Sequence, residues 1–241
     1  MVTKAEISLV RSLADKRSRL ENGLFVIEGR KMVEEALASG FSVRKVYGTD
    51  EFASLAGCET VSRKVIERMS SLRTPQGILA LVEIPSYDLP RSAEKQLILA
   101  LDGVQDPGNM GTIIRIADWF GIVDVVCSPG SADCFNPKVV QATMGAILRV
   151  RVHYTALPQW LASVSAPVYG TFLEGEDIYR AQLTAQGVIV LGNEGGGISA
   201  QAAQAVTRKL YIPPYPAGEG SGESLNVATA AAIVCSEFRR R

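Results

Sequence analysis

Residues 99–121 read LALDGVQDPGNMGTIIRIADWFG, and they indicate the fold class more clearly than any other stretch. The apolar run before Asp102 is typical of a buried strand, whereas the apolar residues after Asn109 recur at helical spacing. Turn-forming Asp, Gln, Pro, Gly and Asn fill the loop between them. We therefore predict a strand, a polar loop and an amphipathic helix that has Arg115 on its buried side. The stretch contains no lysine or histidine, so phosphate or metal chemistry is not the first expectation.

The same alternation of strand and helix continues to the end of the chain. We predict strands at 96–102, 122–128, 148–154, 167–175, 187–195 and 209–214, and helices at 109–121, 136–147, 156–164, 199–206 and from about 224 to 238. Asn136 is expected to cap the second of these helices. Nearly continuous apolar strands that alternate with helices indicate a mostly parallel sheet covered on both faces. The predicted fold class is therefore α/β.

The first part of the chain shows a smaller α/β pattern. We predict helices at 3–21, 30–40 and 62–72, and strands at 24–29, 43–49 and 77–84. The following stretch PSYDLPRSAEK has two prolines and mixed charges, which is typical of a linker. We therefore predict three parts: a domain at 1–85, a linker at 86–95 and a second domain at 96–241.

The composition excludes several classes of site. The 241 residues include 25 Lys and Arg against 25 Asp and Glu, so the net charge does not point to a partner. The four cysteines form no close pair, as in a reduced cytosolic protein. His153 is the only histidine, which disfavours a zinc site and a histidine-activated nucleophile, and we interpret it as structural. Because no signal core and no apolar run of roughly 18 residues is found, we expect a soluble cytoplasmic protein without metal or membrane partner.

Three loops are predicted at the carboxyl ends of strands, where parallel α/β sheets bind ligands. The first follows Asp102, the second is the glycine run Gly192–Gly197, and the third leads from Ile212 to Ser224-Leu225-Asn226. Each has an ordinary explanation, because Asn109 or Ser224 could cap a helix and glycine turns are common. The glycine run lets a ligand approach the backbone closely, but it matches neither the P-loop nor the Rossmann fingerprint. These absences disfavour a nucleotide-binding Rossmann enzyme.

Taken together, the three loops resemble a known family. DPGNMGTIIRIADWFG, VLGNEGGGIS and IPPY followed by ESLNVATAAAI are similar, in order and spacing, to the three motifs of the SpoU (TrmH-type) RNA ribose 2′-O-methyltransferases of the SPOUT superfamily. FNPKVVQATMGAILRVRV, at 135–152, resembles the segment between the first two motifs. The resemblance covers about 96–241, and the first domain is similar to a substrate-binding domain shaped like a ribosomal protein. The chain departs from the shortest family members in its longer loop at 214–222.

The resemblance implies a methyltransferase domain with a trefoil knot, which binds S-adenosylmethionine and acts as a homodimer. Its cofactor-binding positions correspond to Gly192, Ile212 and Leu225, with Thr171, Leu173, Asn193 and Gly195 nearby. Its polar catalytic positions correspond to Asn109, Arg115, Glu194, Ser224 and Asn226. Arg115 could act as a base, but a guanidinium normally stays protonated. Our preferred hypothesis is that Arg115 grips an RNA phosphate and orients the ribose hydroxyl, while Asn109 and Glu194 hold the arginine or the nucleotide.

RNA is the implied partner, with ribosomal RNA favoured over transfer RNA because a separate domain precedes the methyltransferase domain. Basic residues of the first domain could contact RNA or could simply be solvated; they are Arg11, Lys16, Arg17, Arg19, Arg30 and Lys31. The alternative function is a non-catalytic RNA-binding or ribosome-assembly protein that keeps the fold. The presence of all the polar catalytic positions argues for the enzyme.

Overall fold

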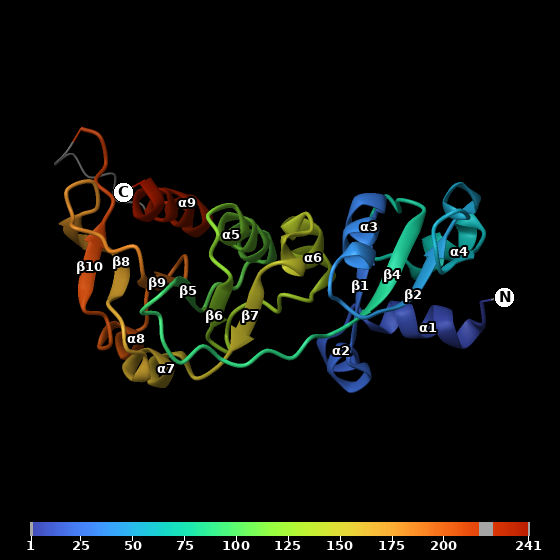
Figure 1. The fold of residues 1–241 in the computed structure, drawn as a ribbon, viewed down its shortest axis with the longest axis horizontal. Helices are drawn as coiled ribbons and strands as arrows, with labels where there is room; N and C mark the ends of the chain where they lie inside the picture. Colours follow the sequence, from blue (N-terminus) through green and yellow to red (C-terminus); the bar gives the residue numbers. More distant parts are fainter. Residues whose placement is uncertain (1, 217–223, 241) are drawn as a thin grey trace. The chain divides into compact units, whose positions relative to one another are not determined.

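The computed structural model describes residues 2–216 and 224–240, and the chain divides into two compact units (Figure 1). Unit 1 comprises Met1–Ser86 and Asp133–Leu148, whereas unit 2 comprises Tyr87–Ala132 and Arg149–Arg241. The chain therefore passes between the units three times. The segment Asp133–Leu148 falls within the range predicted for the second domain, yet it packs in unit 1.

Unit 1 contains a four-stranded sheet in the order β1-β4-β2-β3. The central strand β4 (Ile78–Glu83) pairs antiparallel with β1 (Leu24–Glu28) and with β2 (Val43–Gly48), and β2 pairs parallel with β3 (Cys58–Thr60). The helices before and between these strands are α1 (Lys4–Ser12), α2 (Lys16–Asn22), α3 (Arg30–Ala38) and α4 (Arg63–Met69), with a short 3-10 helix η1 (Asp50–Phe52). Side chains of α1 and α4 pack against the sheet, among them Ile7, Val10, Ile66 and Met69.

The prediction of one helix at 3–21 was wrong, because the chain turns between α1 and α2. The Asp15 carboxylate accepts hydrogen bonds from the backbone N–H groups of Arg17 and Ser18, at 2.9 and 3.2 Å, and so caps a new helix. The break between α1 and α2 also determines the burial of one basic residue. Arg19 is buried, so it is not available as an RNA contact, contrary to the sequence-based expectation.

The segment Asp133–Leu148 adds α6 (Pro137–Thr143) and the 3-10 helix η2 (Ala146–Leu148) to unit 1. The predicted cap is confirmed, because Asn136 Oδ1 accepts the Lys138 N–H at 2.9 Å. The ring of Phe135 lies against that of Phe25 in β1, with centroids 4.6 Å apart. η2 spans the end of the predicted helix and Leu148, the first residue of the predicted strand, and the strand itself begins only at Arg151.

Unit 2 contains a six-stranded sheet in the order β10-β8-β9-β5-β6-β7, and all neighbouring strands are parallel. The strands are β5 (Leu97–Asp102), β6 (Asp124–Cys127), β7 (Arg151–Tyr154), β8 (Val168–Asp177), β9 (Gly187–Gly192) and β10 (Arg208–Tyr211). The helices are α5 (Pro107–Trp119), α7 (Leu157–Ser163), α8 (Ala200–Ala203) and α9 (Val227–Arg240). The predicted α/β class with a parallel sheet is confirmed.

Helices cover both faces of this sheet. Ile98 and Ala100 of β5 share one buried cluster with Trp160 of α7 and Ala202 of α8. Because side chains alternate along a strand, Leu99 of β5 points to the opposite face, where α5 and α9 pack against each other. Arg239 of α9 fastens this pair, since its guanidinium donates to the carbonyl oxygens at the end of α5.

Candidate active site

The first motif enters α5 through a capped turn. The Asp106 carboxylate accepts the Asn109 N–H at 2.8 Å, and Pro107 occupies the first turn of the helix. Asp106 is therefore the N-cap, and the simple explanation of Asn109 as the cap was wrong. The sequence contained the signal, because proline suits the first helical position and Asp precedes it. With the cap supplied by Asp106, the side chain of Asn109 is free for other partners.

The second motif is a closed turn after β9, in which Asn193 and Gly197 exchange two backbone hydrogen bonds of 2.9 Å. The Asn193 side chain holds the turn together: its Oδ1 accepts the N–H groups of Gly195 and Gly196, and its Nδ2 donates to the Gly103 carbonyl at 2.7 Å. A Cβ on Gly192 would lie 2.1 Å from the Gly197 carbonyl carbon, so only glycine fits there. The turn is thus bonded directly to the loop of the first motif.

A second bond between these loops was missed by the sequence analysis. Asp102, the last residue of β5, accepts the Ser199 N–H through Oδ2 at 2.8 Å. Asp102 lies opposite Gly192 in the register of β5 and β9. An aspartate at the carboxyl end of an apolar strand was the available signal.

Three side chains connect the three motifs. Asn109 Nδ2 donates to Glu194 Oε1 at 2.6 Å, and Asn226 Nδ2 donates to Asn109 Oδ1 at 2.9 Å. Asn226 also caps α9, because its Oδ1 accepts the N–H groups of Ala228 and Thr229. We call Asn226, Asn109 and Glu194 the three-motif bridge. The expected cap Ser224 was wrong: α9 begins at Val227, and Ser224 makes no hydrogen bond within residues 2–216 and 224–240.

Arg115 does not join the three-motif bridge of its own chain. It lies six residues beyond Asn109, which corresponds to about 9 Å along the helix axis and about 120° around it. Its side chain is exposed, not on the buried side as the sequence suggested. Among the described residues it has no hydrogen-bond or ion-pair partner. Trp119, one turn further along α5, is 85% exposed.

The residues expected at the cofactor lie at the carboxyl edge of the sheet. β8 bulges against β10 between Gly170 and Glu176, and this bulge contains Thr171 and Leu173. Leu173 is 71% exposed and Leu225, next to Asn226, is 51% exposed. Thr171 Oγ1 donates to the Val190 carbonyl of β9 at 3.3 Å, two residues before Gly192. Ile212 follows the last residue of β10 and is half-buried, and residues 217–223 of the long loop lie outside the described residues.

This edge presents chemistry suited to a cationic, partly apolar ligand. The glycine turn offers backbone that a ligand can approach, Leu173 and Leu225 offer apolar surface, and Glu194 offers a carboxylate. S-adenosylmethionine combines a positive sulfonium with apolar methylene groups and an adenine ring, so these residues fit it. Among the described residues, no group of three or more His, Cys, Asp or Glu side chains is arranged to hold a metal ion.

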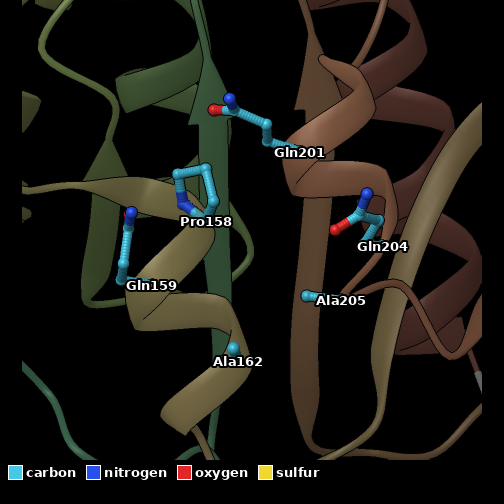
Figure 2. A pocket seen from close by; sticks show the side chains of 6 residues that line it. All are labelled: Pro158, Gln159, Ala162, Gln201, Gln204 and Ala205. Carbon is cyan, nitrogen blue, oxygen red and sulfur yellow. The ribbon is translucent and has the colours of Figure 1, made fainter.

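Two other features of unit 2 involve none of the residues expected at the cofactor or in catalysis. His153 Nε2 lies 2.9 Å from Asp124 Oδ1, and both residues are buried. Burial would raise the pKa of Asp124, but hydrogen bonds from His153 and Arg151 outweigh it and hold that pKa below its ordinary value. An open hollow of about 360 Å³ lies between α7 and α8. Figure 2 shows the side chains that line it. Its lining contains no charged side chain; it consists of Pro158, Gln159, Ala162, Gln201, Gln204 and Ala205.

Comparison with known proteins agrees with this geometry. Residues 96–236 match the SpoU rRNA Methylase family, and residues 4–80 match the MRM3-like substrate binding domain. The chain belongs to the SpoU rRNA methylase family. The family resemblance stated from the three motifs is therefore confirmed. Within the described chain, no helix has both the length and the apolar character needed to span a membrane.

Curated relatives and solved structures resemble the chain over nearly its whole length. It is 35% identical to the Bacillus subtilis 23S rRNA (guanosine(2553)-2′-O)-methyltransferase RlmP, over 95% of this chain and 94% of that protein. A Porphyromonas gingivalis structure, described as a TrmH-family RNA methyltransferase, has a TM-score of 0.91 and 41% identity, covering 100% of this chain and 99% of that one. The AdoMet-bound rRNA methyltransferase from Sinorhizobium meliloti has a TM-score of 0.86 and 27% identity, covering 100% and 96%.

Proposed function

We propose that the chain transfers a methyl group from S-adenosylmethionine to a ribose 2′-hydroxyl of 23S ribosomal RNA, in the cytoplasm. The observation that carries this proposal is the three-motif bridge, which joins the three loops that the family motifs predict. The similarity to a 23S rRNA 2′-O-methyltransferase over nearly the full length supports the choice of RNA. That relative acts on a guanosine, which makes a guanosine the first nucleotide to examine.

The residues of the chain position the two reactants and place charged groups beside them. S-adenosylmethionine, when bound, supplies a methyl group on a positive sulfonium. The Gly192–Gly197 turn would hold the donor through backbone groups, and Leu225 and Leu173 would cover its apolar parts. Holding two reactants in line accounts for about 7–11 kcal/mol of barrier lowering in favourable cases. The three-motif bridge fixes Glu194 and Asn109 beside the reacting atoms, where each orients the ribose or the donor.

Arg115 would grip an RNA phosphate and orient the 2′-hydroxyl, which must lose its proton in or before the transition state. The guanidinium remains charged, so it suits an anchoring role better than that of a base. An Arg115→Ala enzyme that methylates RNA at nearly the wild-type rate would refute this role.

We further propose that Arg115 acts in the site of a second copy, so that the enzyme is a homodimer. Its position on α5, turned away from the three-motif bridge and without a partner among the described residues, supports this arrangement. The exposed Trp119 on the same helix is a large apolar side chain that a second copy could cover.

Mixed dimers test the arrangement directly. Arg115→Ala and Glu194→Ala subunits are each expected to be inactive alone. Equal mixing after subunit exchange should restore about a quarter of wild-type activity, because half of the dimers then contain one intact site. Mixtures that stay inactive, although subunit exchange is demonstrated, would contradict the shared site.

Methyl transfer itself is tested with tritium-labelled S-adenosylmethionine and purified ribosomal or transfer RNA. Label in 23S rRNA, absent with Glu194→Ala, is the expected result. Mapping 2′-O-methyl groups in RNA from cells with and without the protein then identifies the nucleotide. RNA binding without any label would favour the alternative, a non-catalytic RNA-binding or ribosome-assembly protein.

A further inference from the structure

A buried ion pair fastens the segment Asp133–Leu148 within unit 1. Arg19 Nη2 lies 2.5 Å from Asp133 Oδ2, and the two side chains are 2% and 16% exposed. The other terminal nitrogen, Nη1, donates to the carbonyl oxygens of Leu13 and Ala14, at 2.7 and 2.9 Å. Arg19 therefore joins the turn between α1 and α2 to Asp133.

Stability alone does not explain this pair. Burying two charges costs much of what their attraction returns, and a well-packed apolar pair is often at least as stable. Arg19 Nε is also buried without a hydrogen-bond partner among the described residues, which adds a further cost. The neighbouring Phe25 and Phe135 rings already supply apolar contact for the segment. What the ion pair adds is direction, because Arg19, held by the carbonyl oxygens of Leu13 and Ala14, presents a fixed donor to the Asp133 carboxylate.

The residue before Asp133 is held in unit 2 by the loop of the first motif. The Ala132 N–H donates to the Val104 carbonyl at 2.8 Å, and Tyr154 Oη donates to the Ala132 carbonyl at 2.6 Å. Val104 lies between β5 and α5, in the same loop as the Asp106 cap. A single peptide bond thus separates a residue bonded to the loop of the first motif from a residue bonded to Arg19.

The residue that follows the other end of the segment is bonded to α5. Leu148 is followed by Arg149, whose guanidinium makes a bidentate ion pair with the Asp118 carboxylate of α5, with distances of 2.8 to 3.0 Å. Arg151 then begins β7. The two residues that flank the segment, Ala132 and Arg149, are therefore hydrogen-bonded near the two ends of α5. This helix bears Asn109 and Arg115.

We propose that Arg19 and Asp133 are positioning residues for methyl transfer, through which the substrate-binding unit sets the loop of the first motif. The proposal rests on the proposed function. RNA held by unit 1 acts on the Asp133–Leu148 segment, and covalent continuity passes any displacement of Asp133 to Ala132 and Val104. Neither residue contacts the RNA or the donor, so their loss alters alignment and leaves binding intact.

Steady-state kinetics of the full-length protein on transcribed 23S rRNA test the proposal. Asp133→Ala should lower kcat about tenfold or more, because misplacing reacting groups slightly costs up to about a hundredfold. The KM for RNA and the Kd for S-adenosylmethionine should stay within about twofold of wild type. Asp133→Asn, which keeps an oxygen acceptor for Arg19, should recover part of the lost kcat.

A matched control is the Lys45–Glu6 ion pair, which is also in unit 1 with an N–O distance of 2.5 Å but is not bonded to the segment. Lys45→Met should leave kcat unchanged, and urea unfolding shows which variants are folded under assay conditions. Equal losses of kcat for Lys45→Met and Asp133→Ala would overturn the proposal, as would an Asp133→Ala enzyme with full kcat.

Hydrogen exchange provides a readout that does not need activity. Binding of 23S rRNA should slow exchange of the amides at 102–109 in the wild type, and this response should be lost in Asp133→Ala. A response that persists in the folded variant would overturn the proposal. A wild type that shows the RNA-dependent response without transferring methyl groups would instead overturn the proposed function alone.

Discussion

Substitution of Asn226 separates two roles that one side chain combines. Its Oδ1 caps α9, whereas its Nδ2 donates to Asn109 in the three-motif bridge. Asn226→Ala removes both. Loss of an N-cap costs about 1 kcal/mol, and loss of an exposed hydrogen bond costs about 0.5–1.5 kcal/mol or less. We therefore expect the free energy of unfolding to fall by about 1–2 kcal/mol, with a loss of activity.

Asn226→Asp keeps the cap and breaks the bridge. Aspartate is as good an N-cap as asparagine, and its charge favours a helix N-terminus. The former Nδ2 becomes an oxygen that faces Asn109 Oδ1. Asn109 cannot rotate its amide to compensate, because its own Nδ2 donates to Glu194. The free energy of unfolding should stay within about 0.5 kcal/mol, while a misalignment worth about 1 kcal/mol lowers kcat about fivefold.

Urea unfolding and tritium transfer from S-adenosylmethionine measure the two effects on the same preparations. Ser224→Ala is the control for the cap, and its free energy of unfolding should equal that of the wild type. The reasoning fails if Asn226→Asp is destabilised as much as Asn226→Ala. It also fails if Asn226→Asp is fully active, since the bridge would then have no part in catalysis.

Three further substitutions test the glycine turn and the buried aspartate. Gly192→Ala should weaken binding of S-adenosylmethionine by about tenfold or more in calorimetry, because its Cβ would lie 2.1 Å from the Gly197 carbonyl carbon. Gly196→Ala should bind normally, since its Cβ would meet nothing closer than an Asn193 oxygen at 4.0 Å. Asp124 has a lowered pKa, so its contribution to stability is complete above its ordinary pKa of about 3.9 and is lost as the pH falls through the lower value of the folded state. In urea unfolding, Asp124→Asn should therefore be less stable than the wild type at pH 7, with a difference that shrinks in acid; a constant difference would contradict the assignment.

Periodicity predicted the α/β class and most of the elements, because burial imposes its pattern on each strand and helix separately. It did not predict that β9 lies between β5 and β8. An apolar strand shows that it is buried, but not which strand lies beside it. The same limit explains the segment Asp133–Leu148: its helix and the cap Asn136 were predicted, whereas its packing in unit 1 depends on Phe25 and Arg19, more than a hundred residues earlier.

The candidate site was predictable as a set of loops but not as a set of contacts. Parallel strands bring their carboxyl ends to one edge, and this placed the three motifs together. Which side chain caps and which one bridges depends on competition between neighbours. Asp106 takes the cap that Asn109 could have taken, and Asn226 takes the one that Ser224 could have taken. Such competition is decided by backbone geometry that a sequence pattern does not contain.

The ordinary explanation and the functional explanation of these motifs are both partly correct. Each motif does contain a helix cap or a glycine turn, and each is common in proteins that bind nothing. What matters in this chain is that side chains of the three motifs, some of which also cap a helix or shape a turn, are hydrogen-bonded across the motifs. Asn109 is released by Asp106, Asn193 shapes its turn and also reaches the Gly103 carbonyl, and Asn226 caps α9 while donating to Asn109. Because amides both donate and accept, one side chain can serve a helix end and a neighbouring loop at once, and in this way hydrogen bonds link the three loops.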